Sequence, residues 1–181
     1  LAGILTGRIN PSGKLAETFP RVYEDTPTGH NGQFGRDDMV CYEEEIMVGY
    51  RHYEKNDILP MFCFGHGLSY TEFAYHDLQV KQDNDAKDRV SISFDIENVG
   101  QIDGREIVQI YVRDEECTVI RPEKELKAFK SITLKAGSIC RVEITLDSMA
   151  FSFYDEKKHD FCVEPGIFEI CVGNSTQNIL L

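Results

Sequence analysis

The chain has few basic residues, and it has no long apolar run. Among its 181 residues, 19 Lys and Arg stand against 31 Asp and Glu, which gives a formal net charge of −12. Nucleic-acid binding and adhesion to an anionic membrane surface both need clustered Lys and Arg, so both are disfavoured. No apolar stretch approaches the roughly 18 residues that a membrane span requires. We therefore expect neither nucleic acid nor a membrane as a partner.

Cysteine and histidine spacing predicts no metal site. None of the six cysteines forms a C-x-x-C pair, and no two of the five histidines share a metal-ligand spacing. We therefore expect no metal and no cofactor. A chain of this length can build a core without disulfides, so we expect the cysteines to be reduced and mostly buried. Reduced thiols, and an N-terminus without a basic segment followed by an apolar stretch, favour a cytoplasmic location.

From Tyr75 onward, apolar and polar residues alternate in short runs. The alternation is clearest at 90–97, 108–112, 141–146 and 168–172, and turn-forming residues separate these runs. Further strands are expected at 78–80, 126–134, 151–153 and 161–163. Seven or eight short strands in about 110 residues are typical of a two-sheet, immunoglobulin-like sandwich. The predicted fold is therefore mainly β.

Residues 1–63 lack the regular alternation of apolar and polar residues. Residues 1–7 are typical of the end of an amphipathic helix, and 14–19 of a short extended run, whereas 42–53 fits either a helix or a strand. Residues 24–40 are rich in Asp, Gly, Thr and Asn and predict a long irregular loop, which usually indicates a functional loop or a missing partner. The run 7–14 lacks the glycine spacing of a phosphate loop, so no nucleotide site is predicted.

Two clusters in 42–53 are candidates for ligand binding. Three adjacent glutamates, at 43–45, usually form a solvated surface, but one of them could turn inward to bind Arg51 or a sugar hydroxyl. Tyr42, Tyr50, His52 and Tyr53 form an aromatic cluster that could stack on a sugar, although core packing is the more common role. The absence of tryptophan weakens the case for a stand-alone carbohydrate-binding module.

A set of ordered motifs resembles the C-terminal region of glycoside hydrolase family 3. They are L-T-G-R-I-N-P-S-G-K-L at 5–15, T-F-P at 18–20, the run 42–53, F-G-H-G-L-S-Y at 64–70, N-V-G at 98–100, R-P-E-K-E-L-K at 121–127, V-E-P-G at 163–166 and V-G at 172–173. The resemblance implies the end of the α/β sandwich domain over 1–63 and a fibronectin type III-like domain over 64–181. The chain departs from the family pattern at Glu45, where glycine or aspartate is expected, and at Phe161, where tryptophan is common.

The resemblance also implies a function for a larger parent protein. Family members are typically retaining exo-acting β-glucosidases, which use an aspartate from a (β/α)8 barrel and a glutamate from an upstream part of the α/β sandwich domain. The resemblance implies that neither segment lies within these 181 residues, so it assigns no catalytic residue to this chain. It implies the barrel and the α/β sandwich domain as partners, and a β-glucoside as the substrate of the parent. We expect Glu44, Tyr50, Arg51 and Tyr53 to lie near that substrate.

Two alternatives remain open. The chain could be a stand-alone carbohydrate- or protein-binding module. It could also be an enzyme in its own right that uses the glutamates at 43–45, which would need a second carboxylate facing them.

Overall fold

The computed structural model describes residues 1–32, 41–82 and 89–181. The helices in the described part before residue 73 are short: α1 (Ala2–Leu5), the 3-10 helix η1 (Tyr23–Asp25), α2 (Pro27–Asn31) and α3 (Tyr50–Lys55). The strands that follow are β1 (Phe73–Gln82), β2 (Val90–Asn98), β3 (Gly104–Asp114), β4 (Glu125–Leu134), β5 (Ile139–Leu146), β6 (Phe153–Asp155), β7 (Asp160–Cys162), β8 (Phe168–Ser175) and β9 (Asn178–Ile179). A second 3-10 helix, η2 (Ser148–Ala150), precedes β6.

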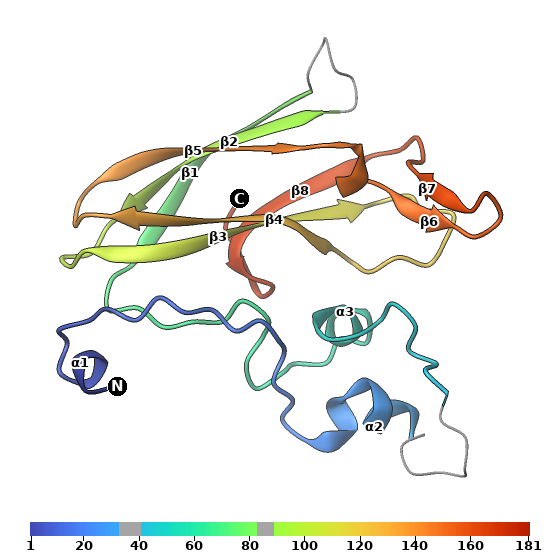
Figure 1. Cartoon of the computed structure of the whole chain (residues 1–181), viewed down its shortest axis with the longest axis horizontal. Helices are drawn as coiled ribbons and strands as arrows, with labels where there is room; N and C mark the ends of the chain where they lie inside the picture. The colour runs from blue at the N-terminus through green and yellow to red at the C-terminus, as the bar shows by residue number, and fades with distance from the viewer. Residues whose placement is uncertain (33–40, 83–88) are drawn as a thin grey trace.

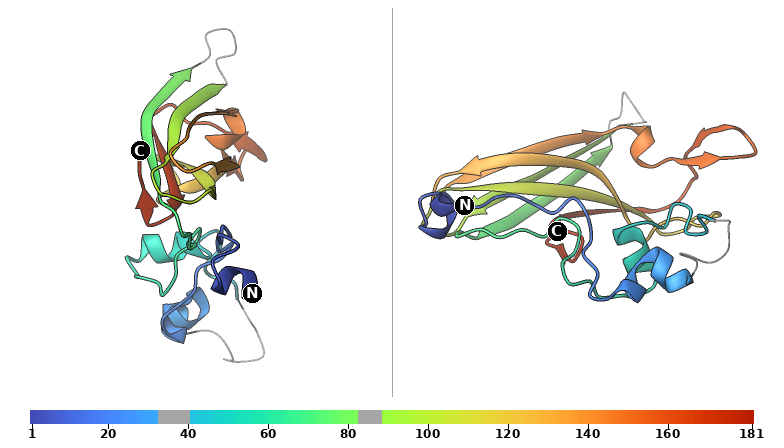
Figure 2. Two further views of the ribbon diagram at one scale, coloured as in Figure 1. Left: turned by 90° about the vertical axis from the view of Figure 1, so that its left-hand side faces the viewer. Right: turned by 60° about the horizontal axis from the view of Figure 1, so that its bottom comes forward.

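The strands form two antiparallel sheets and a hairpin (Figure 1). One sheet has the order β1-β2-β5, the other has the order β4-β3-β8-β9, and β6 pairs with β7. The two sheets pack face to face, and the helices of the N-terminal segment lie along one side of them (Figure 2). The mainly β sandwich predicted from the sequence is thereby confirmed. None of the helices in the described residues is long and apolar enough to span a membrane.

The alternation in β2 explains why this strand lies across the core. Ile92, Phe94 and Ile96 are at most 1% exposed, whereas Ser93 and Asp95 between them are half-buried. Successive side chains of a strand point to opposite faces, so one set enters the core. Phe94 pairs with Val142 of β5 across the sheet, and Val142 is also buried.

The central strand β3 is buried on both faces. Val108, Ile110 and Val112 face the sandwich core, as the alternation predicts. Gln109 and Tyr111 alternate with them, yet both are buried as well, at 3% and 0% exposure. The ring of Tyr111 lies 6.1 Å from that of Tyr50 in α3, so the N-terminal segment covers the outer face of this sheet.

The N-terminal segment is fastened to the sandwich by the motif at 10–14. The side-chain oxygen of Asn10 accepts a hydrogen bond from the Tyr70 amide at 2.8 Å, and its amide group donates to the Asp103 carbonyl at 3.2 Å. Lys14 forms an ion pair with Glu106 of β3 at 2.9 Å, with both side chains largely buried. The polar groups of this motif thus hold two parts of the chain together.

The run 14–19 is extended, as predicted, and lies antiparallel to 61–66. The Leu15 amide donates to the His66 carbonyl, and the Phe19 amide donates to the Phe62 carbonyl, both at 2.8 Å. Gly67 lies directly against this run, because a Cβ added to it would come within 2.3 Å of the Gly13 carbonyl oxygen. Only a residue without a side chain fits this crossing.

Two sequence predictions are corrected. Residues 24–40 were predicted to be an irregular loop, but η1 and α2 occupy 23–31, with Thr26 capping α2 through the Gly29 amide; residues 33–40 lie outside the described part. The six cysteines, all of them in the described ranges, are unpaired, but only Cys63 and Cys171 are buried. The prediction that most are buried is wrong because the others lie in connections or at edge strands, where the fold leaves one side open to solvent.

Candidate functional site

A groove separates the N-terminal segment from one end of the sandwich. Its volume is about 930 Å³. The turn at 43–46 and α3 form one wall, and the 119–122 connection, the start of β4 and the β6–β7 hairpin form the other. Of the four residues expected near a substrate, Glu44 and Arg51 line this groove.

Helix α3 positions Arg51 toward β4. Gly49 precedes the helix with φ of +56°, a conformation that favours glycine, and the chain turns there from the loop into α3. Arg51 Nη2 forms an ion pair with Glu125 Oε1 at 3.0 Å, and Nη1 donates to the Ile46 carbonyl at 3.4 Å. The glutamate that binds Arg51 is therefore Glu125, and the glutamates at 43–45 do not form this pair.

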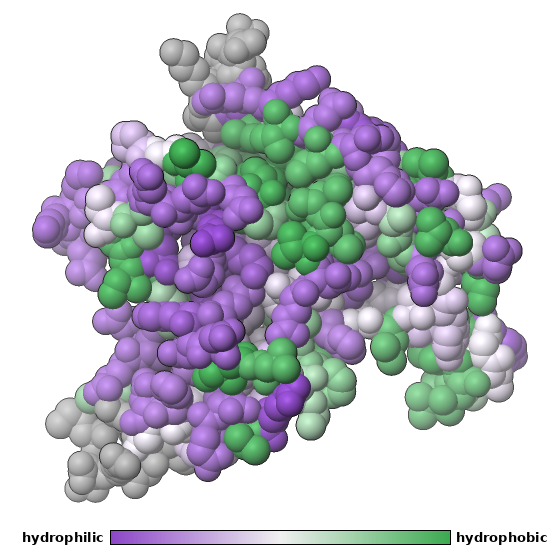
Figure 3. Space-filling model, turned by 180° about the vertical axis from the view of Figure 1, so that it is seen from behind, coloured by the Kyte–Doolittle hydropathy of each residue, from purple (hydrophilic) through white to green (hydrophobic). Residues whose placement is uncertain are grey.

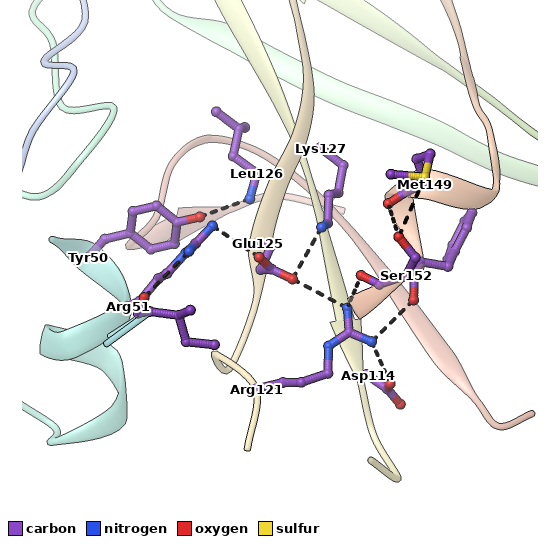
Figure 4. A network of polar contacts seen from close by, with 11 residues as sticks. Tyr50, Arg51, Asp114, Arg121, Glu125, Leu126, Lys127, Met149 and Ser152 are labelled. Carbon is purple, nitrogen blue, oxygen red and sulfur yellow. Dashed lines mark hydrogen bonds and ion pairs between the residues drawn. The ribbon is translucent and has the colours of Figure 1, made fainter. Parts of the chain in front are cut away.

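Arg121 is the centre of a buried polar network at the base of the groove (Figure 4). Its guanidinium donates to Asp114 Oδ2 at 2.9 Å and to Glu125 Oε2 at 3.3 Å. It also donates to the carbonyls of Phe151 and Ser152. The side chains of Arg121 and Asp114 are only 6% and 3% exposed, so this charged pair is largely desolvated. Both terminal nitrogens of Arg121 donate two hydrogen bonds each, which is the condition under which a buried ion pair is tolerated.

Glu125 is held in its ionised form. Burial raises the pKa of this carboxyl, but Lys127, Arg51 and Arg121 act against it, and the net result is a pKa below the ordinary value. A general acid must carry a proton near neutral pH. Glu125 therefore does not suit the role of a catalytic acid. Its Oε1 is paired with Arg51 and its Oε2 with Arg121 and Lys127, so neither oxygen is free to act as the second carboxylate of an active site built on the glutamates at 43–45.

The two tyrosines expected near a substrate point elsewhere. The Tyr50 hydroxyl accepts a hydrogen bond from the Leu126 amide at 2.9 Å (Figure 4). The Tyr50 ring packs against that of Phe64, with the ring centroids 5.1 Å apart. Tyr53 is only 4% exposed. It lines a separate cavity of about 130 Å³ beside α3, together with Thr18 and Glu54. Both tyrosines hold α3 in place.

A second ion pair fastens the same helix to β4. Glu54 binds Lys124 with both side chains about five-sixths buried, at 17% and 16% exposure. Burial raises the pKa of Glu54, and the hydrogen bond from Lys124 opposes that rise. Glu54 Oε2 and Thr18 Oγ1 are buried without a hydrogen-bond partner among the described residues. Helix α3 thus contacts the residues around the start of β4 through Tyr50, Arg51 and Glu54.

His52 links α3 to the η1 segment. Its Nδ1 lies 3.2 Å from the Asn56 amide nitrogen, which is a donor, so the neutral ring carries its proton on Nε2 and donates to the Asp25 carbonyl at 3.2 Å. Burial lowers the pKa of His52 below its ordinary value, and His30 adds to that effect. The ring is therefore a structural hydrogen-bonding group.

The structure explains why position 45 of the family pattern favours glycine or aspartate, and it also brings residues into the groove that the sequence had not singled out. Glu45 has φ of +50°, in the left-handed region that glycine and aspartate tolerate better. Arg121 and Glu125 lie in the R-P-E-K-E-L-K motif, but the motif does not say what these residues contact. Tyr154 and Phe161 of the β6–β7 hairpin also line the groove.

The comparisons with known proteins agree with the architecture. A family model described as a fibronectin type III-like domain matches residues 106–176. The thermostable beta-glucosidase B of Acetivibrio thermocellus is 47% identical over 100% of this chain and 24% of its own length. The probable beta-glucosidase K of Emericella nidulans is 45% identical over 100% of this chain and 21% of its length.

Solved structures extend the match to three dimensions. The family 3 beta-glucosidase of Bifidobacterium adolescentis superposes with a TM-score of 0.93 at 36% identity, over 100% of this chain and 26% of that one. Beta-glucosidase 3B of Thermotoga neapolitana, in complex with glucose, gives 0.90 at 39% identity, over 99% of this chain and 25% of that one. The chain thus spans about a quarter of the length of these relatives. These matches show that the chain corresponds to the C-terminal region, with its fibronectin type III-like domain, of glycoside hydrolase family 3.

Proposed function

We propose that this chain is the non-catalytic C-terminal portion of a retaining exo-β-glucosidase. In this proposal residues 1–63 complete the α/β sandwich domain and residues 64–181 form the fibronectin type III-like domain. The catalytic barrel and the rest of the α/β sandwich domain are its partners, and the parent hydrolyses terminal β-glucosides. The relatives, all of them named as β-glucosidases and about four times longer, support this assignment.

One structural observation carries the proposal: the N-terminal segment exposes an unusual number of large apolar side chains. Single exposed apolar residues are normal, but a concentration of them marks an interaction site. Among the described residues of 1–68, nine are more than half exposed: Leu1, Leu5, Ile9, Val22, Tyr23, Tyr42, Leu59, Met61 and Leu68. Seen from behind, the molecule shows an apolar group at the end that carries α1, and another area over the sandwich (Figure 3). Other domains of the parent would cover such a surface.

The sandwich, in turn, gives this segment a fixed position. The Lys14–Glu106 and Glu54–Lys124 ion pairs join it to β3 and to the start of β4, and both are largely buried. Because these two ion pairs fix the segment against the sandwich, the turn at 43–46 also has a defined position. We propose that this turn helps to shape the substrate entrance of the parent enzyme.

A chimera tests the proposal. The corresponding quarter of the Acetivibrio thermocellus enzyme is replaced by this chain, and hydrolysis of a chromogenic aryl β-glucoside is measured for the chimera, the truncated relative and the 181-residue chain alone. We expect the chimera to keep its turnover within about tenfold of the relative, because both catalytic carboxylates remain. The truncated relative should melt at a lower temperature, and the chain alone should be inactive. Turnover by the chain alone that is lost in Glu44→Gln would refute the proposal, as would a folded but inactive chimera.

A further inference from the structure

The groove has the surface chemistry of a site for a neutral, polyhydroxylated ligand. Its wall carries six acidic and five basic side chains, a net of −1, even though the whole chain carries −12. A polyanion or a polycation would be attracted to an excess of the opposite charge, which this groove lacks. Its volume, about 930 Å³, falls within the roughly 300–1,000 Å³ range of ligand sites.

Two aromatic rings stand exposed at the hairpin side of the groove. Tyr154 and Phe161 pair across β6 and β7, with ring centroids 5.4 Å apart and planes at 74°. Tyr154 is 51% exposed and Phe161 is 53% exposed, so neither ring is buried in a core. Aromatic faces offer apolar contact area at low cost in side-chain entropy, which suits the C–H faces of a sugar ring.

Unused hydrogen-bonding groups stand at the opposite wall. The carboxylates of Glu43 and Glu44 form no hydrogen bond or ion pair with the other described residues, and the same holds for the ammonium group of Lys55. The ammonium group of Lys157 is also unpaired on the hairpin side, within the described part of the chain. Carboxylates accept hydrogen bonds from hydroxyl groups, and ammonium groups donate to them. Arg121 and Glu125, by contrast, are occupied by each other and by their neighbours, so they form a rigid floor.

We propose that this groove binds a neutral gluco-oligosaccharide. The sugar would lie with its ring faces on Tyr154 and Phe161, and its hydroxyl groups would bond to Glu43, Glu44 and the neighbouring lysines. The choice of glucose as the sugar rests on the proposed function, whereas the choice of a neutral polyol rests on the groove itself. A further segment of the parent protein is the competing occupant, and it would leave the groove without sugar affinity.

Isothermal titration calorimetry of the 181-residue chain with cellotriose tests this inference. We expect saturable binding in the millimolar range that changes little with added salt, since the ligand is uncharged. Tyr154→Ala and Phe161→Ala should each weaken binding by roughly tenfold, as truncation of a central aromatic contact does. Phe129→Ala is the matched control, because Phe129 is 70% exposed on β4 outside the groove. Trigalacturonate, which is charged, should bind more weakly than cellotriose.

The outcomes separate this inference from the proposed function. Absence of saturable binding by the folded chain, or binding that Phe129→Ala weakens as much as Tyr154→Ala, overturns the sugar-binding groove. An active chimera combined with no sugar binding refutes the groove alone. If an aromatic variant fails to fold, Glu43→Gln combined with Glu44→Gln keeps the shape of the wall and should still weaken binding by removing the charged acceptors.

Discussion

Replacement of Asn98 by alanine should be among the most destabilising single changes in this chain. Asn98 ends β2 and is 0% exposed. Its side-chain oxygen accepts hydrogen bonds from the Thr71 hydroxyl at 2.6 Å and from the Gly100 amide at 3.1 Å. Its amide group donates to the carbonyls of Ile102 at 2.8 Å and Leu134 at 3.2 Å. All four hydrogen-bonding positions of the side chain are thus used to join the two sheets and the connection between them.

The size of the effect follows from these four contacts. A neutral hydrogen bond contributes about 1 kcal/mol net, and a buried group left without a partner costs about 1–3 kcal/mol. The Gly100 amide and the Ile102 carbonyl are only partly buried, so water can replace part of the loss there. We therefore expect Asn98→Ala to lower the free energy of unfolding by about 2–4 kcal/mol, which corresponds to a melting temperature lower by roughly 5–15 °C for a chain of this size.

Equilibrium unfolding in urea, with thermal melting as a second probe, measures this change. Asn178→Ala is the control, because Asn178 is exposed and, among the described residues, its side chain makes one hydrogen bond, to Asn174. Its effect should stay within about 0.5 kcal/mol, as is usual for surface substitutions. If the two variants unfold at the same urea concentration, the reasoning from buried hydrogen bonds is wrong.

Three further predictions concern the contacts between the N-terminal segment and the sandwich, and the core itself. Gly67→Ala should destabilise the chain by about 1–3 kcal/mol in urea unfolding, because the new methyl group would overlap the Gly13 carbonyl oxygen. Gly13→Ala is the control: a Cβ at Gly13 meets no atom within 4 Å, so this variant should be nearly neutral. Tyr75→Phe should increase the free energy of unfolding by about 1 kcal/mol, because the buried hydroxyl of Tyr75 has no hydrogen-bond partner among the described residues. A urea midpoint that is unchanged or lower contradicts this prediction. The pKa of His52 is lowered on folding, so the unfolded chain binds more protons near pH 6, and stability should be complete above pH 6.5 and fall as the pH drops below it. Melting temperatures between about pH 7.5 and about pH 5.5 should therefore fall more steeply in the natural chain than in His52→Gln, and equal slopes would exclude this ring as the cause.

Local sequence patterns were sufficient to predict the β-sandwich. Alternation in β2 and β5 identified the buried faces because side chains of a strand point to opposite sides with a period of two residues. The motif at 98–100 marked a turn, and the structure adds the buried hydrogen bonds of Asn98 behind it. The helical end of 1–7 and the extended run at 14–19 were likewise apparent from their residues.

Long-range placement decided the rest. Gln109 and Tyr111 have the alternation of solvent-facing residues, but the N-terminal segment covers them, and no local pattern contains that information. Arg51 and Glu125 are 74 positions apart, so their ion pair exists only because α3 docks against β4. The amino-acid sequence by itself predicted most of the strands, the side chains that they turn toward the sandwich core, and the family; the strand predicted at 151–153 begins only at Phe153. The tertiary structure alone decided which charged groups form ion pairs and which charged groups of the groove have no such partner among the described residues, because an ion pair depends on the distance between two groups in space.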